Sequence, residues 1–391
     1  MKNFINLFKR EFNLFANNSV VMAIFIGAPL LYGLLLGAVY EKGKVDNLPV
    51  LVVDLNDSPL SNTLIQMIED NEVLNPNIVY DENELQQKII DKEYAAILTI
   101  PQGFEGKILQ KRHPEVTVNI NTSNILSANY AAKALQVILG TMNAGIEIEG
   151  LKKQGIPAIT AKQQYNAFGV AYQRFFNASA NYMTFLWPGV LGVIIQQVFM
   201  LALALSFAQE FENKTFYSEF LPKTKNIPYM MLIKSLPFWI MGIGILLAIR
   251  AMFPFFKIPF NADPLAMIVL LSVLITSVTF LGILVSIAIP SQLKATEILM
   301  VVATPSFILS GFTWPLSQMP SFIVGIAKII PLTHFLEGLR KVLLYNATLS
   351  DIIKEINALL ILTVIFGVLS YLLLKFKIIR HNKKITLGEM H

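Results

Sequence analysis

The sequence predicts a polytopic membrane protein: an all-α membrane part with six transmembrane helices, and an α/β domain inserted after the first of them. Charged residues make up only 15 % of the chain, whereas soluble domains carry about 25 %, and the mean hydropathy is +0.56. A spanning helix needs roughly 20 mainly apolar residues. Six stretches predict such helices: 20–39, 183–208, 235–249, 265–289, 299–312 and 357–374. The third and fifth are short, so we expect them to extend into less apolar flanks.

The composition also excludes several classes of site. The chain has no cysteine, which excludes disulfides, thiolate metal sites and cysteine nucleophiles. Its four histidines are scattered, without the HExxH spacing of a zinc site. The net charge of +5 would suit nucleic acid, but the basic residues lie next to apolar stretches, which is typical of membrane topology. We therefore expect this chain to bind no metal, no cofactor and no nucleic acid.

Residues 1–19 have the pattern of an amphipathic helix. Its apolar residues recur at helical spacing: Phe4, Ile5, Phe8, Phe12 and Phe15. Its basic and polar residues lie mostly opposite: Lys2, Lys9, Arg10 and Asn13. Such a helix lies in the membrane interface; the alternative is an inward extension of the first span. That span, residues 20–40, is longer than the core of a signal peptide and no A-x-A site follows, so we expect it to be retained.

Residues 41–181 are charged and have the periodicity of a soluble domain. Four runs predict strands: 48–55, 73–80, 94–101 and 115–121. After the first strand, Ser58 is a good N-cap and Pro59 suits the first position of a helix. Further helices are expected over 82–93 and over 125–151, where Gly140 and Gly145 interrupt the pattern. Alternating strands and helices predict a compact α/β domain. It lies outside the cytoplasm because it follows one span, and residues 156–181 then return the chain to the membrane surface.

Lysine and arginine in the short flanks of the spans predict the orientation. With both termini in the cytoplasm, the flanking basic residues inside are Lys2, Lys9, Arg10, Lys214, Lys223, Lys225, Lys234, Lys294, Lys375, Lys377, Arg380, Lys383 and Lys384. The short outer loops hold fewer: Arg250, Lys257, Lys328, Arg340, Lys341 and Lys354. The excess favours this orientation, with residues 375–391 as a basic cytoplasmic tail.

The sequence contains no phosphate-binding loop (GxxxxGK[ST]), no GxGxxG fingerprint after a strand and no nucleophile elbow. Asp54 and Asp57 flank a strand end and have the spacing of a catalytic pair, but turn and cap chemistry is the simpler interpretation. We therefore expect the chain itself to hydrolyse neither a nucleotide nor any other substrate.

Residues 209–223, between the second and third spans, are charged yet contain several aromatic and aliphatic side chains. The residues Phe211, Thr215, Ser218 and Leu221 would share one face of a helix. A short amphipathic helix along the cytoplasmic surface would make a docking surface for a partner. A solvated loop held at the lipid headgroups is the alternative, and the physical pattern favours neither.

Two further places have unusual patterns. Gln196 and Gln197 lie in the middle of the second span, where a polar side chain costs free energy unless it bonds to another helix or lines a substrate path. Residues 313–335, before the last span, hold apolar residues between prolines, with Trp314 as an interfacial anchor. This pattern predicts short re-entrant helices that dip toward the bilayer; the alternative is an ordinary loop anchored by aromatic residues.

Together these features resemble the permease subunit of type-2 ABC exporters, the drug and polymer export class with a large extracytoplasmic loop after the first span. Matching motifs run along nearly the whole chain: Phe8-Lys9-Arg10-Glu11, VVDLNDSPLS from Val52 to Ser61, IPQGF from Ile100 to Phe104, Pro331-Leu332-Thr333 and Arg340. In 209–223 the matching residues are Glu210, Glu212, Thr215, Glu219, Leu221 and Pro222. In the outer segment they are Ser310, Gly311, Phe312, Pro315, Pro320 and Pro331. Lys214 replaces the family's usual glycine, and the usual arginine before Glu210 is missing.

The resemblance implies a half-transporter in the bacterial inner membrane. Two permeases, identical or related, would pair, and each would dock a separate cytoplasmic ABC ATPase at residues 209–223, hereafter the coupling segment. ATP and magnesium would bind to that ATPase and not to this chain. The substrate would move out of the cytoplasm or the inner leaflet, and a periplasmic adaptor would be a further partner.

Two other functions remain open at this point. A membrane-anchored receptor or scaffold would use the outer α/β domain to bind a ligand or an envelope protein, although one span would suffice as its anchor. An ion-coupled secondary transporter usually carries ionisable residues within its spans, whereas Lys234, Arg250 and Glu297 are expected only at span ends.

Overall fold

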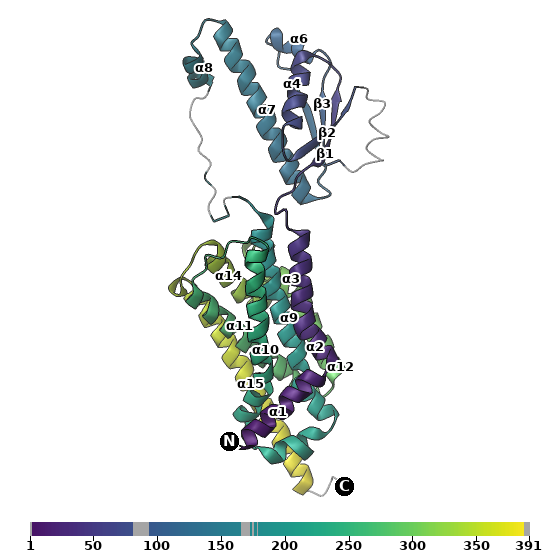
Figure 1. Cartoon of the computed structure of the whole chain (residues 1–391), viewed down its shortest axis with the longest axis vertical. Helices are drawn as coiled ribbons and strands as arrows, with labels where there is room; N and C mark the ends of the chain where they lie inside the picture. The colour runs from purple at the N-terminus through teal and green to yellow at the C-terminus, as the bar shows by residue number, and fades with distance from the viewer. Residues whose placement is uncertain (1, 81–93, 166–172, 174–175, 178, 387–391) are drawn as a thin grey trace. The chain divides into compact units, whose positions relative to one another are not determined.

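The computed structural model describes residues 2–80, 94–165, 173, 176–177 and 179–386 (Figure 1). The chain forms two compact units: the membrane unit, Met1–Gly43 with Arg174–His391, and the inserted unit, Lys44–Gln173. Six described helical stretches are long and apolar enough to cross a bilayer: Ser19–Val39, Tyr182–Glu212, Ile227–Phe255, Pro264–Ala288, Gln292–Leu309 and Leu349–Lys383. The predicted fold class, six spans with a small α/β insertion, is confirmed.

The inserted unit is a four-stranded sheet that shares a core with its helices (Figure 1). Strand β1 (Leu48–Asp54) lies between β2 (Leu74–Val79) and β3 (Ala96–Ile100) and runs parallel to both, whereas β4 (Thr117–Ile120) is antiparallel to β3. The helices of this unit are α4 (Pro59–Glu69), α6 (Phe104–Leu109), α7 (Ile125–Lys153) and α8 (Ala158–Tyr165).

Asp54 builds the turn that joins β1 to α4. Its Oδ1 accepts the backbone N–H groups of Asn56 and Asp57, and its Oδ2 accepts the Ser61 hydroxyl at 2.6 Å. Ser58 and Ser61 form a reciprocal capping box at the start of α4. The interpretation of Asp54 as turn and cap chemistry is therefore confirmed.

Each of the four observed strands lies within one of the predicted ranges. The order and register of the strands were not predicted. The helix expected over 82–93 lies outside the described residues. Helix α7 is continuous through Gly140 and Gly145, so the predicted interruption is wrong. Its apolar face packs on the sheet, which offsets the roughly 1 kcal/mol that each glycine costs in a helix interior.

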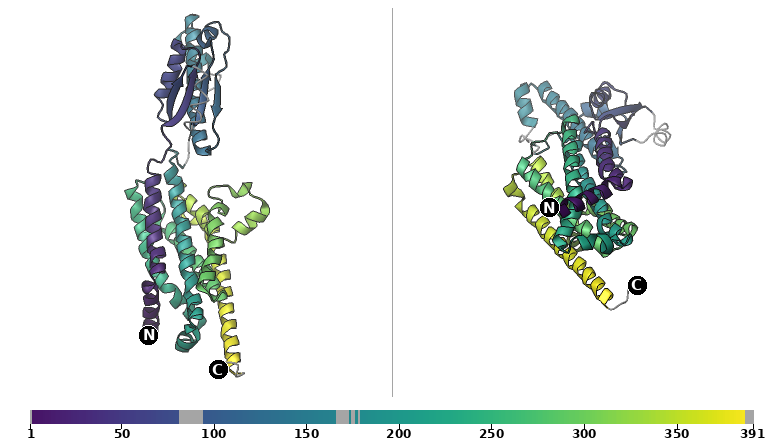
Figure 2. Two further views of the ribbon diagram at one scale, coloured as in Figure 1. Left: turned by 90° about the vertical axis from the view of Figure 1, so that its right-hand side faces the viewer. Right: turned by 60° about the horizontal axis from the view of Figure 1, so that its bottom comes forward.

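The described residues of the membrane unit form helices joined by turns and loops (Figures 1 and 2). Its elements, in order, are α1 (Lys2–Asn17), α2 (Ser19–Met22), the π-helical turn η1 (Ala23–Gly27), α3 (Ala28–Val39), α9 (Tyr182–Glu212), the π-helical turn η3 (Phe216–Phe220), the 3₁₀ turn η4 (Leu221–Lys223), α10 (Ile227–Phe255), α11 (Pro264–Ala288), α12 (Gln292–Leu309), the 3₁₀ turn η5 (Leu316–Gln318), α13 (Ser321–Ala327), α14 (Pro331–Leu344), the 3₁₀ turn η6 (Leu349–Ile352) and α15 (Ile353–Thr386). Helix α9 is the most buried of the spans. It packs against α3, α11, α12 and α14.

Caps and turns set the ends of the spans more than apolar runs do. Asn226 accepts the backbone N–H of Tyr229, and Pro228 lies in the first turn, so α10 begins eight residues before the predicted 235. Helix α12 ends at Leu309 because Gly311 takes a φ of +79°, and Phe312 therefore lies beyond the helix instead of closing the span. The short fifth span extends into its N-terminal flank, as expected.

Helix α1 differs from a simple interfacial helix. Leu7, Glu11 and Phe15 are buried, whereas Phe4 and Ile5 on the predicted apolar side are exposed. The helix packs on α10, and a carboxylate can face the protein there because it meets a cation, described below. The predicted separation of apolar and charged faces is therefore only partly correct.

Candidate functional site

Four charged side chains from three helices form one cluster, hereafter the ion cluster. Arg10 and Glu11 come from α1, Glu210 from the end of α9 and Lys234 from α10. Arg10 Nη1 lies 2.6 Å from Glu210 Oε1 and 2.8 Å from Glu11 Oε1. Lys234 Nζ lies 2.7 Å from Glu11 Oε2 and 2.7 Å from Glu210 Oε1. The cluster therefore ties α1 to both α9 and α10.

Three of the four side chains of the ion cluster are buried, Arg10 is 19 % exposed, and the charges balance. The side chain of Lys234 is 2 % exposed, and those of Glu210 and Glu11 are 3 % and 6 % exposed. Burial alone would lower the pKa of Arg10, but its hydrogen bond to Glu210 and the charges of Glu210 and Glu11 raise that pKa above its ordinary value. Arg10 thus remains a cation, and two cations face two carboxylates. Charges taken out of water persist only when they are paired in this way.

The coupling segment is a folded turn and not one amphipathic helix. Lys214 has a φ of +60°, the left-handed conformation that usually ends a helix at glycine. This turn breaks the helical face predicted for Phe211, Thr215, Ser218 and Leu221. After it, η3 buries Phe216 and Phe220 completely. The segment is also not a solvated loop, because these rings pack into the core of the membrane unit.

The predicted coupling residues divide into buried and exposed groups. Glu210 belongs to the ion cluster, and Thr215 supports it by donating to Glu210 Oε2 at 2.5 Å. Glu212 accepts the backbone N–H of Gln292 at 2.7 Å, at the start of α12. Glu219 Oε2 lies 3.4 Å from Arg10 Nη2 but its side chain is 54 % exposed. Leu221 is half-buried and Pro222 is exposed, both in η4.

Lys234 directly precedes the predicted third span (235–249), whereas in the structure the helix already begins at Ile227. Lys234 lies inside α10, one of the most deeply buried side chains in the described protein. The signal that would have found it is the Asn226–Pro228 start of α10, which lies about two turns before Lys234. The pairing itself joins residues 200 positions apart, such as Arg10 and Glu210, and no local pattern predicts that.

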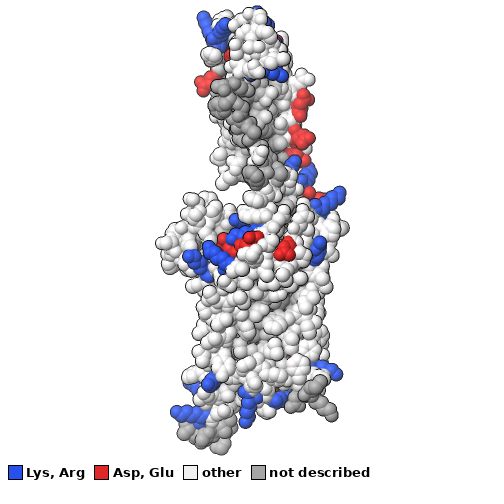
Figure 3. Space-filling view, turned by 90° about the vertical axis from the view of Figure 1, so that its left-hand side faces the viewer, with Lys and Arg blue, Asp and Glu red and all other residues white. Residues whose placement is uncertain are grey.

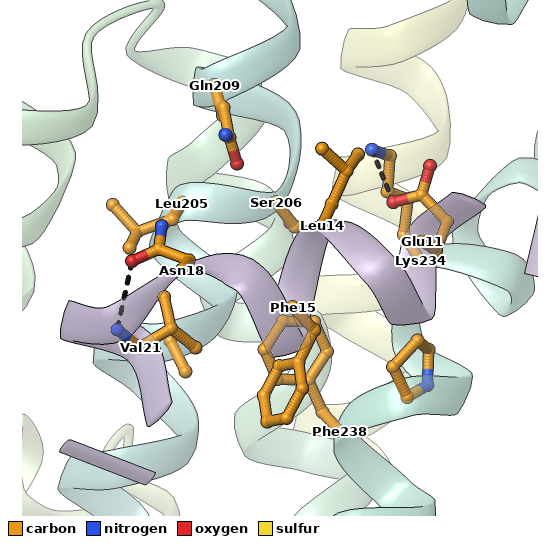
Figure 4. A pocket seen from close by; sticks show the side chains of 12 residues that line it. Glu11, Leu14, Phe15, Asn18, Val21, Leu205, Ser206, Gln209, Lys234 and Phe238 are labelled. Carbon is orange, nitrogen blue, oxygen red and sulfur yellow. Dashed lines mark hydrogen bonds and ion pairs between the residues drawn. The ribbon is translucent and has the colours of Figure 1, made fainter. Parts of the chain in front are cut away.

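A small cavity of about 30 Å³ lies between α1, α9 and α10, beside the ion cluster (Figure 4). Its polar lining comes from Glu11, Asn18, Ser206, Gln209 and Lys234. This volume and polarity suit ordered water and not a drug-sized ligand. Among the described residues, no group of three or more potential metal ligands comes together.

The outer motif is organised around Arg340 of α14. Its Nη2 donates to the carbonyl of Phe312 at 3.0 Å and to that of Gly311 at 3.4 Å, and its guanidinium lies 4.9 Å from the Phe312 ring centroid. Ser310 Oγ donates to the carbonyl of Phe307 at 2.6 Å. Arg340 thus ties α14 to the backbone just after the end of α12, and Ser310 satisfies a carbonyl in the last turn of that helix.

The segment 313–335 contains short helices between prolines, as predicted. Pro315 precedes η5, Pro320 precedes α13, and Pro331 is the first residue of α14. Helices α13 and α14 meet at an angle of 86°, and together they are apolar enough to pass as one broken span. Their re-entry into the bilayer remains a prediction.

The two glutamines of α9 have different surroundings. Gln196 is 1 % exposed, and neither its Oε1 nor its Nε2 has a hydrogen-bond partner among the described residues. Gln197 is half-buried. Within the described part of the chain, Gln196 therefore makes no interhelical hydrogen bond, and its place on a substrate route remains a prediction.

Comparison with known proteins gives consistent matches over most of the chain. The sequence model of the family described as "ABC-2 family transporter protein" matches residues 19–372. The probable multidrug ABC transporter permease YbhR of Escherichia coli is 23 % identical over 377 residues, which cover 95 % of this chain and 98 % of that protein. The linearmycin resistance permease protein LnrN of Bacillus subtilis is 22 % identical over 380 residues, covering 92 % and 96 %.

A longer relative also matches. The ABC transporter G family member 20 of Dictyostelium discoideum is 25 % identical over 343 residues, which cover 86 % of this chain. The match spans 45 % of the length of that relative, so the chain corresponds to about half of it.

Proposed function

The chain belongs to the ABC-2 family of transporter proteins, and on that premise we propose that it is the permease subunit of an exporter driven by a separate ATP-binding subunit. The observation that carries the proposal is the coupling segment. It is a compact turn whose solvent-exposed residues include Glu212, Ser218, Glu219 and Pro222. Where the segment begins, Glu210 pairs with Arg10 of α1 and Lys234 of α10. The absence of a phosphate-binding loop from the sequence agrees with a motor on another polypeptide.

The ion cluster gives the coupling segment a rigid mechanical connection. A partner that moves Glu219 or the η3 turn would act on α1 through Arg10 and on α10 through Lys234. Buried ion pairs resist separation, because pulling them apart leaves an unpaired charge in a medium of low dielectric. We therefore infer that the segment, α1 and the first turns of α10 move as one body when ATP binds to the partner.

The substrate class follows from the relatives' names only as a proposal. One is named as a probable multidrug permease and another for linearmycin resistance. We propose small amphipathic compounds as cargo, moved outward from the cytoplasm or the inner leaflet.

We further propose that both termini are cytoplasmic and that the inserted unit is outside. Lysine and arginine side chains gather at the end of the membrane unit where α1 and the end of α15 lie (Figures 1 and 3). On the face drawn, a broad belt of described side chains without charge separates this end from the other (Figure 3), as the positive-inside rule expects. Single cysteines at Lys383 and Glu149 would test this: an impermeant thiol reagent should label only Glu149→Cys on intact cells. Equal labelling would overturn the orientation.

A second copy of this chain is the proposed neighbour of α12. Among the six described spans, α12 has the smallest buried share, 22 %, and is also the least apolar. A helix surrounded by lipid should be the most apolar, so lipid is an unsuitable cover for it. Its buried residues are Ala295, Leu299, Ala303 and Ser306; the opposite stripe is Glu297, Val301, Thr304 and Ile308.

The length of α12 strengthens this argument. Its 18 residues extend about 27 Å at roughly 1.5 Å per residue, which barely crosses a hydrocarbon core of about 30 Å. Glu297 therefore lies within the membrane, where a carboxylate is unfavourable unless it faces protein or water. Lys294 lies three residues earlier, on a nearby face of α12, and is also exposed. Across a twofold axis, Lys294 of one copy is a suitable partner for Glu297 of the other.

The test of the proposed function is co-purification. Tagged full-length chain, purified from its native membrane, should retain a separate ABC ATPase, and a bound drug should stimulate ATP hydrolysis. The double variant Glu219→Lys/Pro222→Ala should lose both, while the chain still inserts in the membrane. If no ATPase is retained by the unmodified chain, the receptor or scaffold function becomes the better account.

A further inference from the structure

The end of α15 contacts the coupling segment on both sides of its turn. Lys377 Nζ lies 4.3 Å from the ring centroid of Phe211, which precedes the turn. The imidazole of His381 stacks on the ring of Tyr217, which follows the turn, with centroids 3.7 Å apart and planes inclined by 17°. Lys377 and His381 are four residues apart, so they lie on one face of the helix.

The contacted rings belong to a continuous aromatic group. Phe211 lies 4.8 Å from Phe216, and Phe216 lies 5.0 Å from Tyr217, centroid to centroid. Phe216 is itself completely buried. The α15 contacts therefore act on the interior of the coupling segment and not on one loosely held side chain.

The coupling segment depends on such contacts because its own backbone is irregular. Between α9 and α10 it consists of a left-handed residue, Lys214, one π-helical turn and one 3₁₀ turn. Short elements of this kind have little stability alone. On its other side the segment is held by Arg10 of α1, which reaches Glu219 and lies 5.7 Å from the centroid of Phe220. The segment is thus held by two helices, α1 near the start of the sequence and α15 near its end.

We propose that Lys377 and His381 are positioning residues, which hold the coupling segment in the conformation that the ATP-binding subunit engages. This inference rests on the proposed function, because it gives the C-terminal end of α15 a part in the same coupling. Helix α15 packs along α11. A movement of the coupling segment would therefore be transmitted through α15 to α11, in addition to α1 and α10. The basic end of α15 then serves the transport cycle as well as membrane topology.

The direct test needs no partner. Since the chain has no cysteine, a single cysteine at the exposed Ser218 can carry a nitroxide label on the purified full-length protein. We expect the double variant Lys377→Ala/His381→Ala to lose the immobilised component of its spectrum. The conservative pair Lys377→Arg/His381→Phe keeps a cation and a ring and should restore it. A label at the exposed Lys354, at the other end of α15, should not respond to either pair.

An unchanged Ser218 spectrum in the alanine pair would overturn the proposal, as would a failure of the conservative pair to rescue. A second measurement uses the complex with the ATPase: the alanine pair should lose drug-stimulated ATP hydrolysis, and the conservative pair should keep it. If the label is released but the unmodified chain binds no ATPase, the positioning role stands and the proposed function fails. If the ATPase binds and stimulation is the same in the alanine pair, the positioning role fails and the proposed function stands.

Discussion

Lys234 Nζ lies 2.7 Å from Glu210 Oε1, in a place where neither side chain is more than 3 % exposed. The carboxylate also holds Arg10 and accepts from Thr215. One glutamate at the end of α9 thus connects α1, α10 and the start of the η3 turn. The contact joins the membrane core to the segment that we propose binds the ATPase.

Replacing Lys234 by methionine should destabilise the protein strongly. Removing one partner of a buried pair leaves a charge uncompensated and costs about 3–5 kcal/mol. The thermal midpoint of the full chain in detergent measures the change. Lys152→Met is the control, because Lys152 pairs with Glu149 at 2.5 Å while their side chains are 38 % and 61 % exposed; such pairs contribute under about 1 kcal/mol. Equal shifts for both variants would show that the ion cluster is not buried as described.

Lys214→Gly should stabilise the coupling segment. Lys214 has a φ of +60°, and the left-handed conformation costs a residue with a Cβ atom about 1–2 kcal/mol, but costs glycine little. We expect a rise in the thermal midpoint that corresponds to about 1 kcal/mol. Ser218→Gly in the η3 turn, where φ is not positive, is the matched control and should lower it. A fall for Lys214→Gly would mean that its side chain has a role that outweighs its backbone conformation.

A cysteine at Val301 should cross-link two copies of the chain. Val301 is 74 % exposed on the stripe of α12 that we assign to a second copy, and the parent protein has no cysteine to confuse the result. Oxidation in membranes, followed by electrophoresis, should give a dimer. Val364→Cys on α15 is the control: it is also an exposed valine within a span, at 62 %, and should remain a monomer. The reverse pattern would assign the interface to α15.

The inserted unit should fold alone. It has its own core, formed by the sheet with α4 and α7, and its internal contacts separate it from the membrane unit. A fragment of residues 44–173 should be soluble, show mixed helix and strand by circular dichroism, and unfold cooperatively. A disordered spectrum would mean that the membrane unit is required for its core.

The sequence patterns that predicted the spans were strong because lipid demands about 20 apolar residues, and all six were found. The ends of the spans were predicted less well, because a side-chain cap at Asn226 and the backbone conformation of Gly311 set them. The strands were predictable from alternation, but not the sheet order β2-β1-β3-β4, which depends on parallel pairing between distant segments. The same reason hid the ion cluster: Glu210 was identified by its motif, but its partners Arg10 and Lys234 are close only after the helices pack.

The fold of the coupling segment was the least predictable part. Its charged and aromatic residues were compatible with a helix or a loop, and Lys214 concealed a turn that glycine would have revealed. Only the packing of Phe216 and Phe220 into the core decides between the alternatives. The exposed residues Glu219 and Pro222 remain predictions as docking contacts.

The central claim is that the coupling segment touches a separate ABC ATPase, and cross-linking from Ser218 tests it most directly. A single cysteine at Ser218, exposed in the η3 turn of the segment, would carry a photoactivatable cross-linker on the full-length chain in its native membrane. The account predicts a cross-link to the ATPase at Ser218→Cys and none at Glu149→Cys in the inserted unit. No cross-link to the ATPase from Ser218→Cys, or the same yield from both positions, would contradict it.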